Sequence, residues 1–247
     1  MTSSAVHKMP KQLELKQLTL GVTLNAEQKL SNFCFDGAPA LAQAVEHMLI
    51  QNHADSVYVF GAQGVGKSHF LQGCVLKAQD LGKDALYISG QELANIPAHQ
   101  ASECLTGLEF NHLICVDDID CLIADSQWAQ AWFHLYNQLM QLGRQLVVAA
   151  KTNPRTIDCP LDDLRSRLQL ANVFQLNTLD EKATREVLKA KAKQKGLDLS
   201  DEQVAYIFSR SARSLPSLLG VLDLLDAASW HEKRRITIPF IKQVMAW

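Results

Sequence analysis

The segment GAQGVGKS, Gly61 to Ser68, fills every fixed position of the phosphate-binding pattern GxxxxGK[ST]. It follows an apolar run of β-forming residues, Ser56 to Phe60, and precedes an amphipathic helical pattern. Glycines let the backbone curl so that successive N–H groups point inward, and the following helix adds the positive end of its dipole. We therefore expect a strand, a loop and a helix that hold the phosphates of ADP or ATP. A glycine-rich turn that matches by chance is the alternative, and the strand and helix on either side argue against it.

The side chains of this loop have separate expected tasks. The Lys67 ammonium would reach the β- and γ-phosphates as a point charge, and the Ser68 hydroxyl would take one coordination position on Mg²⁺. The nucleotide-binding residues that the motif predicts are Gly61, Gln63, Gly64, Val65, Gly66, Lys67, Ser68 and His69.

The composition describes an ordinary globular protein, with 247 residues of which 47% are hydrophobic and 20% charged. A formal charge of −2 and a pI near 6.4 give no general attraction to nucleic acid, so direct DNA binding is disfavoured. The six cysteines form no CxxC pair, most of them lie in apolar runs, and the eight histidines are scattered. Because the sequence has neither a long apolar run nor a signal-peptide core, we expect a cytoplasmic protein with reduced thiols.

The order of apolar runs predicts the fold class. After a helix over Pro39 to Gln51, strands and helices alternate as far as a short strand over Val173 to Leu176. This alternation predicts an α/β fold with a parallel sheet covered by helices on both faces. The pattern then changes to helices only, which predicts a small helical domain. We expect a flexible arm over residues 1–30, an α/β nucleotide-binding domain over 31–177 and a helical domain over 178–247, with helices near 180–194, 201–211, 214–230 and from 239.

Two acidic residues, Asp117 and Asp118, follow a second apolar strand, His112 to Val116. Four of the five residues in that strand are apolar, as a strand buried on both faces requires. Parallel sheets bind ligands at the carboxyl ends of their strands, so Asp117 is expected to hold Mg²⁺, directly or through water. Asp118 is expected to polarise an attacking water. Adjacent carboxylates also occur in solvated turns, but the position about fifty residues after the phosphate loop favours a catalytic pair.

A third apolar strand, QLVVAA, ends in the polar residues KTN, 151–153. If it lies between the acidic strand and the strand of the phosphate loop, one of these side chains approaches the γ-phosphate; an ordinary loop is the alternative. The next segment, LDDLRSRL, predicts a short helix over Leu161 to Leu168. Its two arginines, Arg165 and Arg167, are either surface charges or arginines that serve the phosphates of a neighbouring subunit.

The phosphate loop, the sequence ICVDDID, the LRSRL helix and the helical C-terminal part together resemble the AAA+ ATPases related to the bacterial replication initiator DnaA. The resemblance is closest to the Hda family of DnaA regulatory inactivators and extends from Gln17 to Trp247. It implies a P-loop AAA+ sheet domain followed by an α-helical lid, with ADP or ATP and Mg²⁺ as cofactors. It also implies a protein that stimulates hydrolysis of DnaA-bound ATP and so restrains replication initiation, with at most weak ATPase activity of its own.

The Hda family carries a short N-terminal sequence of the type QLxLxL that binds the DNA polymerase sliding clamp. QLTLGV, residues 17–22, stands in that position here. The resemblance therefore implies that Gln17, Leu18 and Leu20 bind the clamp, with the leucines as buried anchors. A second register, QLELK at residues 12–16, is the alternative.

The resemblance also assigns Arg167 as an arginine finger. In the relatives a lid helix of the form RxLxGxL begins with a second arginine that contacts the nucleotide, whereas here PSLLGVL places Pro216 at that position. Arg213, three residues earlier, is left as the candidate for this contact. Lys151 stands at a position where the relatives carry an acidic residue. Both departures bear on hydrolysis by this chain more than on nucleotide binding.

Two other functions are compatible with the sequence. One is a self-hydrolysing AAA+ ATPase that acts as a helicase loader or a similar DNA-associated motor, and the other is a scaffold that nucleotide merely stabilises. The basic stretches Lys182 to Lys195 and Lys233 to Arg235 are expected to be solvated helix faces. We expect no helix-turn-helix domain and no sequence-specific DNA binding. Phe33 either packs on the base, as the resemblance implies, or belongs to the core. Both a monomer and a homo-oligomer are compatible with the sequence.

Overall fold

The structure is a computed structural model that describes residues 24–35, 38–51 and 55–247. The predicted clamp-binding residues Gln17, Leu18 and Leu20, together with the alternative register at 12–16, lie outside the described residues.

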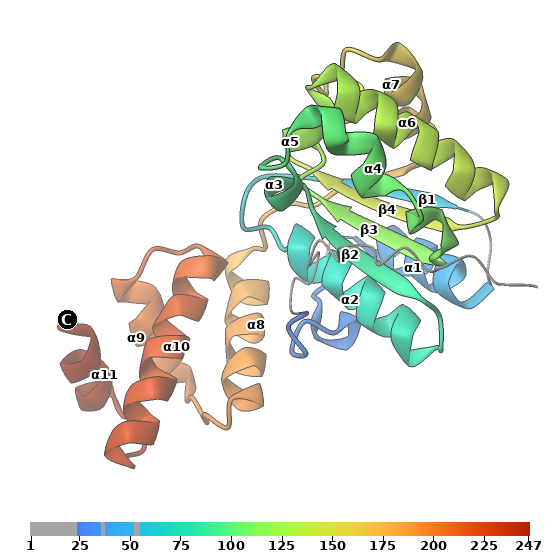
Figure 1. The fold of residues 1–247 in the computed structure, drawn as a ribbon. Helices are drawn as coiled ribbons and strands as arrows, with labels where there is room; N and C mark the ends of the chain where they lie inside the picture. The colour runs from blue at the N-terminus through green and yellow to red at the C-terminus, as the bar shows by residue number, and fades with distance from the viewer. Residues whose placement is uncertain (1–23, 36–37, 52–54) are drawn as a thin grey trace, which may run out of the picture.

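A five-stranded parallel sheet forms the centre of the first domain (Figure 1). Its strands stand in the order β2-β3-β4-β1-β5, so β4 lies between the acidic strand β3 and β1, which precedes the phosphate loop. This confirms the predicted parallel sheet and meets the condition under which a side chain of residues 151–153 would approach the γ-phosphate. The strands are β1 (Ser56–Phe60), β2 (Ala85–Ser89), β3 (Leu113–Asp117), β4 (Gln145–Ala150) and β5 (Asn172–Gln175).

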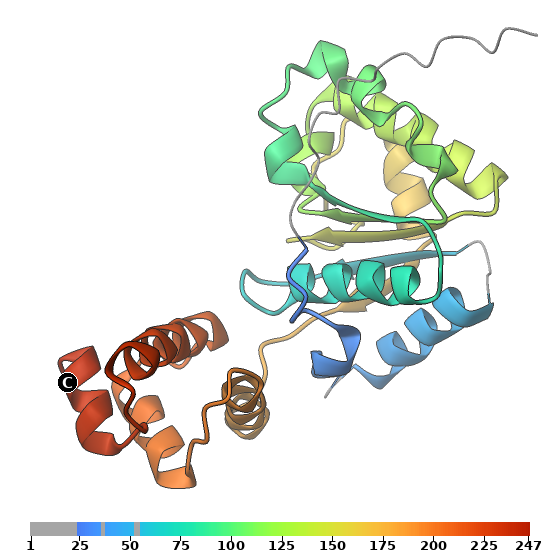
Figure 2. The same ribbon diagram turned by 60° about the horizontal axis from the view of Figure 1, so that its bottom comes forward.

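Helices cover both faces of the sheet, with α1 and α2 on one face and α4, α5, α6 and α7 on the other (Figures 1 and 2). The predicted helix over Pro39 to Gln51 is confirmed, and that over Leu161 to Leu168 is shifted by one residue. The helices of this domain are α1 (Pro39–Gln51), α2 (Lys67–Asp80), α3 (Gly90–Leu93), α4 (Ala101–Leu105), α5 (Asp120–Ile123), α6 (Ser126–Gln141) and α7 (Asp162–Gln169), with 3₁₀ turns η1 (Leu30–Asn32), η2 (Ala98–Gln100) and η3 (Leu108–Phe110).

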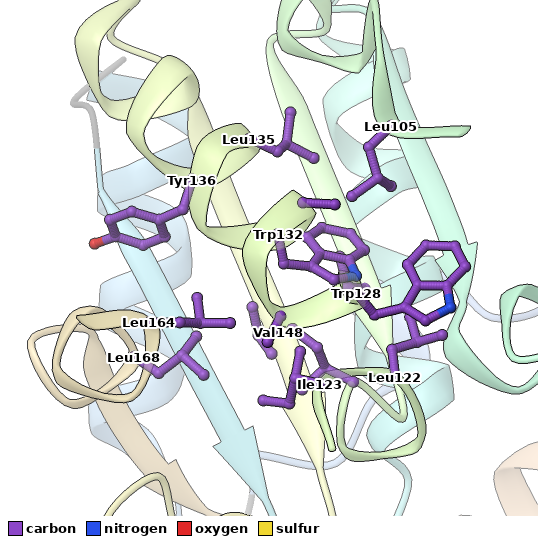
Figure 3. Close-up of a cluster of buried hydrophobic side chains, with 14 of the residues drawn as sticks. Leu105, Leu122, Ile123, Trp128, Trp132, Leu135, Tyr136, Val148, Leu164 and Leu168 are labelled. Atoms are coloured by element: carbon purple, nitrogen blue, oxygen red, sulfur yellow. The ribbon is translucent and has the colours of Figure 1, made fainter. Parts of the chain in front are cut away.

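The sheet is buried on both faces because its strands are almost continuously apolar. Val57 and Val59 pack toward α1 and α2, whereas Tyr58 between them packs toward α6, as the period of two along a strand requires. Figure 3 shows the core on the α6 side of the sheet, where Trp132 of α6 lies over Val148 of β4. The two cores fix the carboxyl ends of the strands, where the acidic residues and the phosphate loop lie.

The C-terminal helices form a separate small domain with its own buried core, set to one side of the sheet (Figures 1 and 2). Each of its helices is capped at the N-terminus by a side-chain oxygen that accepts a hydrogen bond from a backbone N–H group of the first turn. The capping residues are Asp180, Ser200, Ser214 and Thr237. We call this domain the lid. Its helices are α8 (Glu181–Gln194), α9 (Asp201–Arg210), α10 (Leu215–Glu232) and α11 (Ile238–Met245).

All six cysteines are free thiols, as the sequence predicts. Among the described residues, none of the helices combines the length and the apolar character that a membrane span requires.

Candidate functional site

The phosphate loop joins the carboxyl end of β1 to the first turn of α2. Gly64 and Gly66 have φ of +82° and +100°, the left-handed conformation that glycine adopts without strain. Gly66 is the N-cap of α2, and no side chain caps the helix. The first N–H groups of this 14-residue helix therefore remain available to an anion, next to the positive end of the helix dipole.

The first glycine of the motif is needed for a different reason. The φ of Gly61 is not positive, but a Cβ at this position would lie 2.3 Å from the carbonyl oxygen of Leu176. The Leu176 N–H in turn donates to Phe60 O at 2.7 Å. Gly61 is thus required by close backbone contact with the segment that leaves β5 for the lid.

Lys67 is buried, with 7% of its surface exposed. Its Nζ donates to Gly61 O at 2.9 Å and to Ala62 O at 3.0 Å, so the ammonium folds back against its own loop. An ammonium group has three donors, which leaves one for a phosphate oxygen and lets the two carbonyl bonds be exchanged for further phosphate contacts.

Asp117 ends β3 beneath the loop and is buried, with 4% of its surface exposed. The Tyr87 hydroxyl of β2 donates to Asp117 Oδ2 at 2.8 Å. The pKa of Tyr87 is raised, chiefly by burial and then by the Asp117 charge, while hydrogen bonds with Gln72 and Ser68 oppose the shift. The tyrosine hydroxyl therefore links the two predicted metal ligands, Asp117 and Ser68, in one polar cluster.

The donor set of this cluster fits Mg²⁺. A hydroxyl and a carboxylate are the hard oxygen ligands that Mg²⁺ prefers, and this ion usually keeps several waters and binds substrate phosphates for the rest of its octahedron. In the described part of the chain, no group of three or more His, Cys, Asp or Glu side chains could hold a metal. Ser68 and Asp117 could hold Mg²⁺ together with phosphate oxygens, which is how such ions bind in phosphoryl-transfer sites.

Asp118, the predicted water-polarising residue, has φ of +47°, an uncommon conformation for a residue with a side chain. Its Oδ2 accepts a hydrogen bond from Gln91 Nε2 at 2.5 Å. Its backbone fits against Gly90, where a Cβ would lie 2.4 Å from the Asp118 carbonyl oxygen. The carboxylate is therefore held at the edge of the site by the start of α3.

A cavity of about 510 Å³ lies between the phosphate loop and the lid. Its lining includes the predicted residues Gln63, Gly64, Gly66, Lys67, Ser68, His69 and Asp118. The segment before η1, the start of α3, the end of β4, the end of α8 and the helix α10 complete it. Their lining residues are Asn25, Glu27, Gln28, Gln91, Lys151, Lys191, Lys195, Leu215, Pro216, Leu219 and Asp223.

A smaller cavity of about 210 Å³ lies on the other side of the loop, between Val65 and the segment that joins β5 to α8. Phe33 lines it and also packs against Phe35 and Phe70, with ring centroids 4.8 and 5.5 Å apart, and against His69 at 5.5 Å. Phe33 thus packs against the core, as one of its two alternatives required, and its packing on a base stays a prediction.

The lid meets the loop through Pro216 rather than through an arginine. A Cβ on Gly64 would lie 2.8 Å from Pro216 Cγ, so the start of α10 sits directly on the loop. Arg213 is 75% exposed, lies 3.9 Å from Glu181 Oε2, and is not part of the cavity lining. The structure therefore does not bring Arg213 together with the other predicted nucleotide-binding residues.

Lysines take the place of arginine along this cavity. Lys151 lines it from the end of β4, Lys191 from α8 and Lys195 from the C-cap of α8. Both lid lysines were expected on a solvated helix face, whereas the structure places them half-buried in the wall of the cavity. Their spacing of four residues puts them on one side of a helix, which is the signal that was available.

Arg165 and Arg167 differ in their surroundings. Arg165 forms a salt bridge with Asp162 and donates to Cys159 O at 3.4 Å. Arg167 is exposed, and within the described residues no hydrogen bond or ion pair engages its side chain. It is also absent from the lining of the 510 Å³ cavity, so it does not serve the nucleotide site of its own chain.

The parallel sheet, the phosphate loop with its acidic strand, and the helical lid define a P-loop protein of the AAA+ class. Residues 24–175 match the family described as the bacterial DnaA ATPase domain, and residues 180–245 match the Hda lid domain. The chain belongs to the bacterial DnaA ATPase family, as an Hda-like AAA+ protein related to DnaA.

Solved structures share this fold. Domain III of the Thermotoga maritima replication initiation protein DnaA aligns with a TM-score of 0.77 at 19% identity, over 90% of this chain and 97% of that one. AMPPCP-bound DnaA from Aquifex aeolicus aligns with a TM-score of 0.72 at 24% identity, over 85% and 68%. The Thermotoga maritima RuvB Holliday junction branch migration motor aligns with a TM-score of 0.68 at 18% identity, over 89% and 71%.

Proposed function

We propose that this chain binds ADP or ATP with Mg²⁺, docks on the DNA polymerase sliding clamp, and presents Arg167 to ATP bound to DnaA, whose hydrolysis it stimulates. It would thereby act as a negative regulator of replication initiation with at most weak ATPase activity of its own. The observation that carries the proposal is an exposed, unpaired arginine in a chain whose family is that of DnaA itself.

Nucleotide binding is supported by the glycine geometry of the loop, by the uncapped start of α2 and by the buried Lys67. Two similar DnaA structures are described as bound to AMPPCP. Weak hydrolysis is favoured by the lid, where Pro216 stands on the loop and Arg213 points away from it. Within this site Mg²⁺ would supply charge neutralisation of the phosphates, and Lys67 and the loop N–H groups would orient them.

Action on a partner is supported by the surroundings of Arg167. The guanidinium has no carboxylate to neutralise it among the described residues, and the neighbouring Leu170 is 74% exposed. An arginine with an adjacent apolar side chain suits a protein interface better than bulk solvent. An arginine supplied in trans accelerates phosphate hydrolysis by about 10³ to 10⁵ because it stabilises the charge that develops in the transition state.

Clamp binding rests on Gln17, Leu18 and Leu20, which belong to the part of the chain outside the described residues. Two buried leucines contribute about 3 to 6 kcal/mol gross, from which association and ordering costs are subtracted. One arm therefore binds weakly, and two arms on one ring-shaped clamp would bind far more tightly through effective concentration. The six free thiols support a cytoplasmic setting, where DnaA and the clamp would meet this chain as a monomer or a homo-oligomer.

The deciding experiment measures hydrolysis of DnaA-bound ATP with the full chain, the clamp and DNA. Arg167→Ala should reduce the stimulated rate by at least about 10³, toward the unstimulated rate, while nucleotide and clamp binding persist. Arg155→Ala, which removes another exposed arginine ahead of α7, is the matched control and should keep the stimulation. Full activity of the Arg167 variant would refute the finger assignment.

Clamp binding has its own test. Replacement of Gln17 and Leu18 by alanine should abolish co-elution with the clamp, whereas replacement of Gln12 and Leu13 should leave it. The opposite pattern would move the motif to the second register.

The alternative function is a self-hydrolysing DNA-associated motor or helicase loader, and the fold shared with RuvB favours keeping it. It requires a steady ATPase rate of the chain alone that rises with DNA. Hydrolysis that appears only when DnaA is present excludes it.

A further inference from the structure

The 510 Å³ cavity contains more lysines than the single lysine of the phosphate motif. Four lysines line the cavity, Lys67, Lys151, Lys191 and Lys195, against three acidic residues, Glu27, Asp118 and Asp223. Within the described part of the chain, no arginine lines it. Two of the lysines come from α8, opposite the phosphate loop.

The two α8 lysines are not equivalent. Lys195 is neutralised within the lid, because its Nζ lies 3.0 Å from Asp223 and 3.9 Å from Asp226 of α10. No salt bridge engages Lys191 among the described residues. Its Nζ donates only to the main-chain oxygen of Glu27, at the long distance of 3.3 Å. Of the two lid lysines that line the cavity, Lys191 is therefore the one that forms no salt bridge.

The position of Lys191 brings this charge to the phosphate loop. Lys191 lines the same cavity as Lys67, Ser68 and His69 of the loop and the start of α2. The pKa of Lys191 is lowered by burial, and by Lys195, while Glu27 opposes the shift. A partly desolvated ammonium that forms no salt bridge is stabilised by an anion that enters its cavity.

We propose that Lys191 is the lid's ligand for the phosphates of the nucleotide that the loop binds, in place of an arginine from α10. The inference rests on the proposed nucleotide binding and names the lid residue that senses the phosphates. Lysine binds phosphate as a point charge on a flexible stem, so it tolerates the distance from α8 to the loop better than a residue fixed at the start of α10. Lys195 acts only indirectly, by joining α8 to α10 through Asp223.

The test compares the affinities of the full chain for adenosine, AMP, ADP and ATP in the presence of Mg²⁺, by competition with a fluorescent ADP. Lys191→Met should weaken ADP and ATP about tenfold, as expected for one lost charge-assisted contact, and should leave adenosine unchanged. Lys191→Arg should restore most of the loss. Lys193→Met is the matched control, because Lys193 lies on the exposed side of the same helix, and Arg213→Met should also bind ADP within about twofold of the wild type.

Each outcome bears on a different claim. Wild-type affinity of Lys191→Met for ADP overturns this inference alone, and so does a loss that occurs in Arg213→Met instead. A wild-type chain that binds no nucleotide overturns the proposed function as well. An equal loss of adenosine and ADP affinity in a folded Lys191→Met variant, checked by circular dichroism and thermal unfolding, would show a role in shape rather than in phosphate binding and would also overturn it.

Discussion

The sheet side and the lid side of the 510 Å³ cavity differ in how completely they carry the residues expected of a nucleotide site. On the sheet side, every fixed residue of the phosphate motif is present, Lys67 and Asp117 are buried, and the Tyr87 hydroxyl links Asp117 to Ser68. On the lid side, a proline touches the loop and lysines replace arginine. On the proposed function, the sheet side supplies most of the phosphate binding and Lys191 of the lid a smaller part, whereas hydrolysis needs both sides to act on the same phosphate. The contrast is consistent with the proposal that the chain keeps its own nucleotide and acts on that of DnaA.

The largest loss of ADP affinity is expected for Lys67→Ala, on the sheet side. This variant removes the buried ammonium that would contact two phosphates, and we expect ADP affinity to fall about 100-fold or more. Lys77→Ala, at an exposed position of the same helix, should have no effect. Isothermal titration calorimetry measures both. If Lys67→Ala and Lys191→Met weakened ADP binding equally, the proposed division between a binding side and a sensing side would fail.

Two glycine variants, one in the loop and one in the lid, test the contrast between the two sides through the free energy of unfolding. Gly64→Ala forces a side chain into φ of +82° and into contact with Pro216, and we expect it to destabilise the chain by about 1 to 2 kcal/mol and weaken nucleotide binding. Gly220 lies in α10 with open space around its Cα, so Gly220→Ala should stabilise the lid by about 1 kcal/mol. Urea unfolding of each variant measures the free energies. Destabilisation by both would mean that α10 packs against something at Gly220.

The smallest expected effect concerns Tyr87. Tyr87→Phe removes the donor to buried Asp117 and should lower the free energy of unfolding by about 1 to 2 kcal/mol at neutral pH. Because the pKa of Tyr87 is raised in the folded state, its contribution is complete below the unfolded value near 10 and is lost as the pH rises above it. The difference between wild type and variant should therefore shrink in alkaline solution. Tyr58→Phe should behave in the same way, since Tyr58 donates to Thr152 O and burial raises its pKa as well, so it tests whether the effect belongs to buried tyrosines in general rather than to Asp117. A difference that grows with pH would contradict the assigned donor role.

The sequence predicted the sheet side of the molecule well because its signals are local. An apolar strand before a glycine loop, or before two carboxylates, requires the same arrangement whatever surrounds it, and β1, β3 and β4 lie where they were expected. The helix starts of the lid were equally readable, since Ser200 and Ser214 cap the helices that follow them. β5 was less clear because both of its ends are exposed.

What the sequence could not supply was the contact between the domains. The lysine-rich face of α8 fits a solvated helix as well as one turned toward a cavity, and only the placement of the lid on the loop distinguishes Lys191 from Lys193. The same placement turns Arg213 outward. Tyr87 was missed because a tyrosine in a buried strand carries no motif until its partner Asp117 is known.

The narrow space above Gly61 has a mechanical consequence. A methyl group at this position would clash with the segment that connects β5 to the lid, since it would lie 2.3 Å from the Leu176 carbonyl oxygen. A Gly61→Ala substitution is therefore expected to displace the segment that leads from β5 into the lid. The first glycine of the motif thus couples the position of the lid to the packing of the sheet domain.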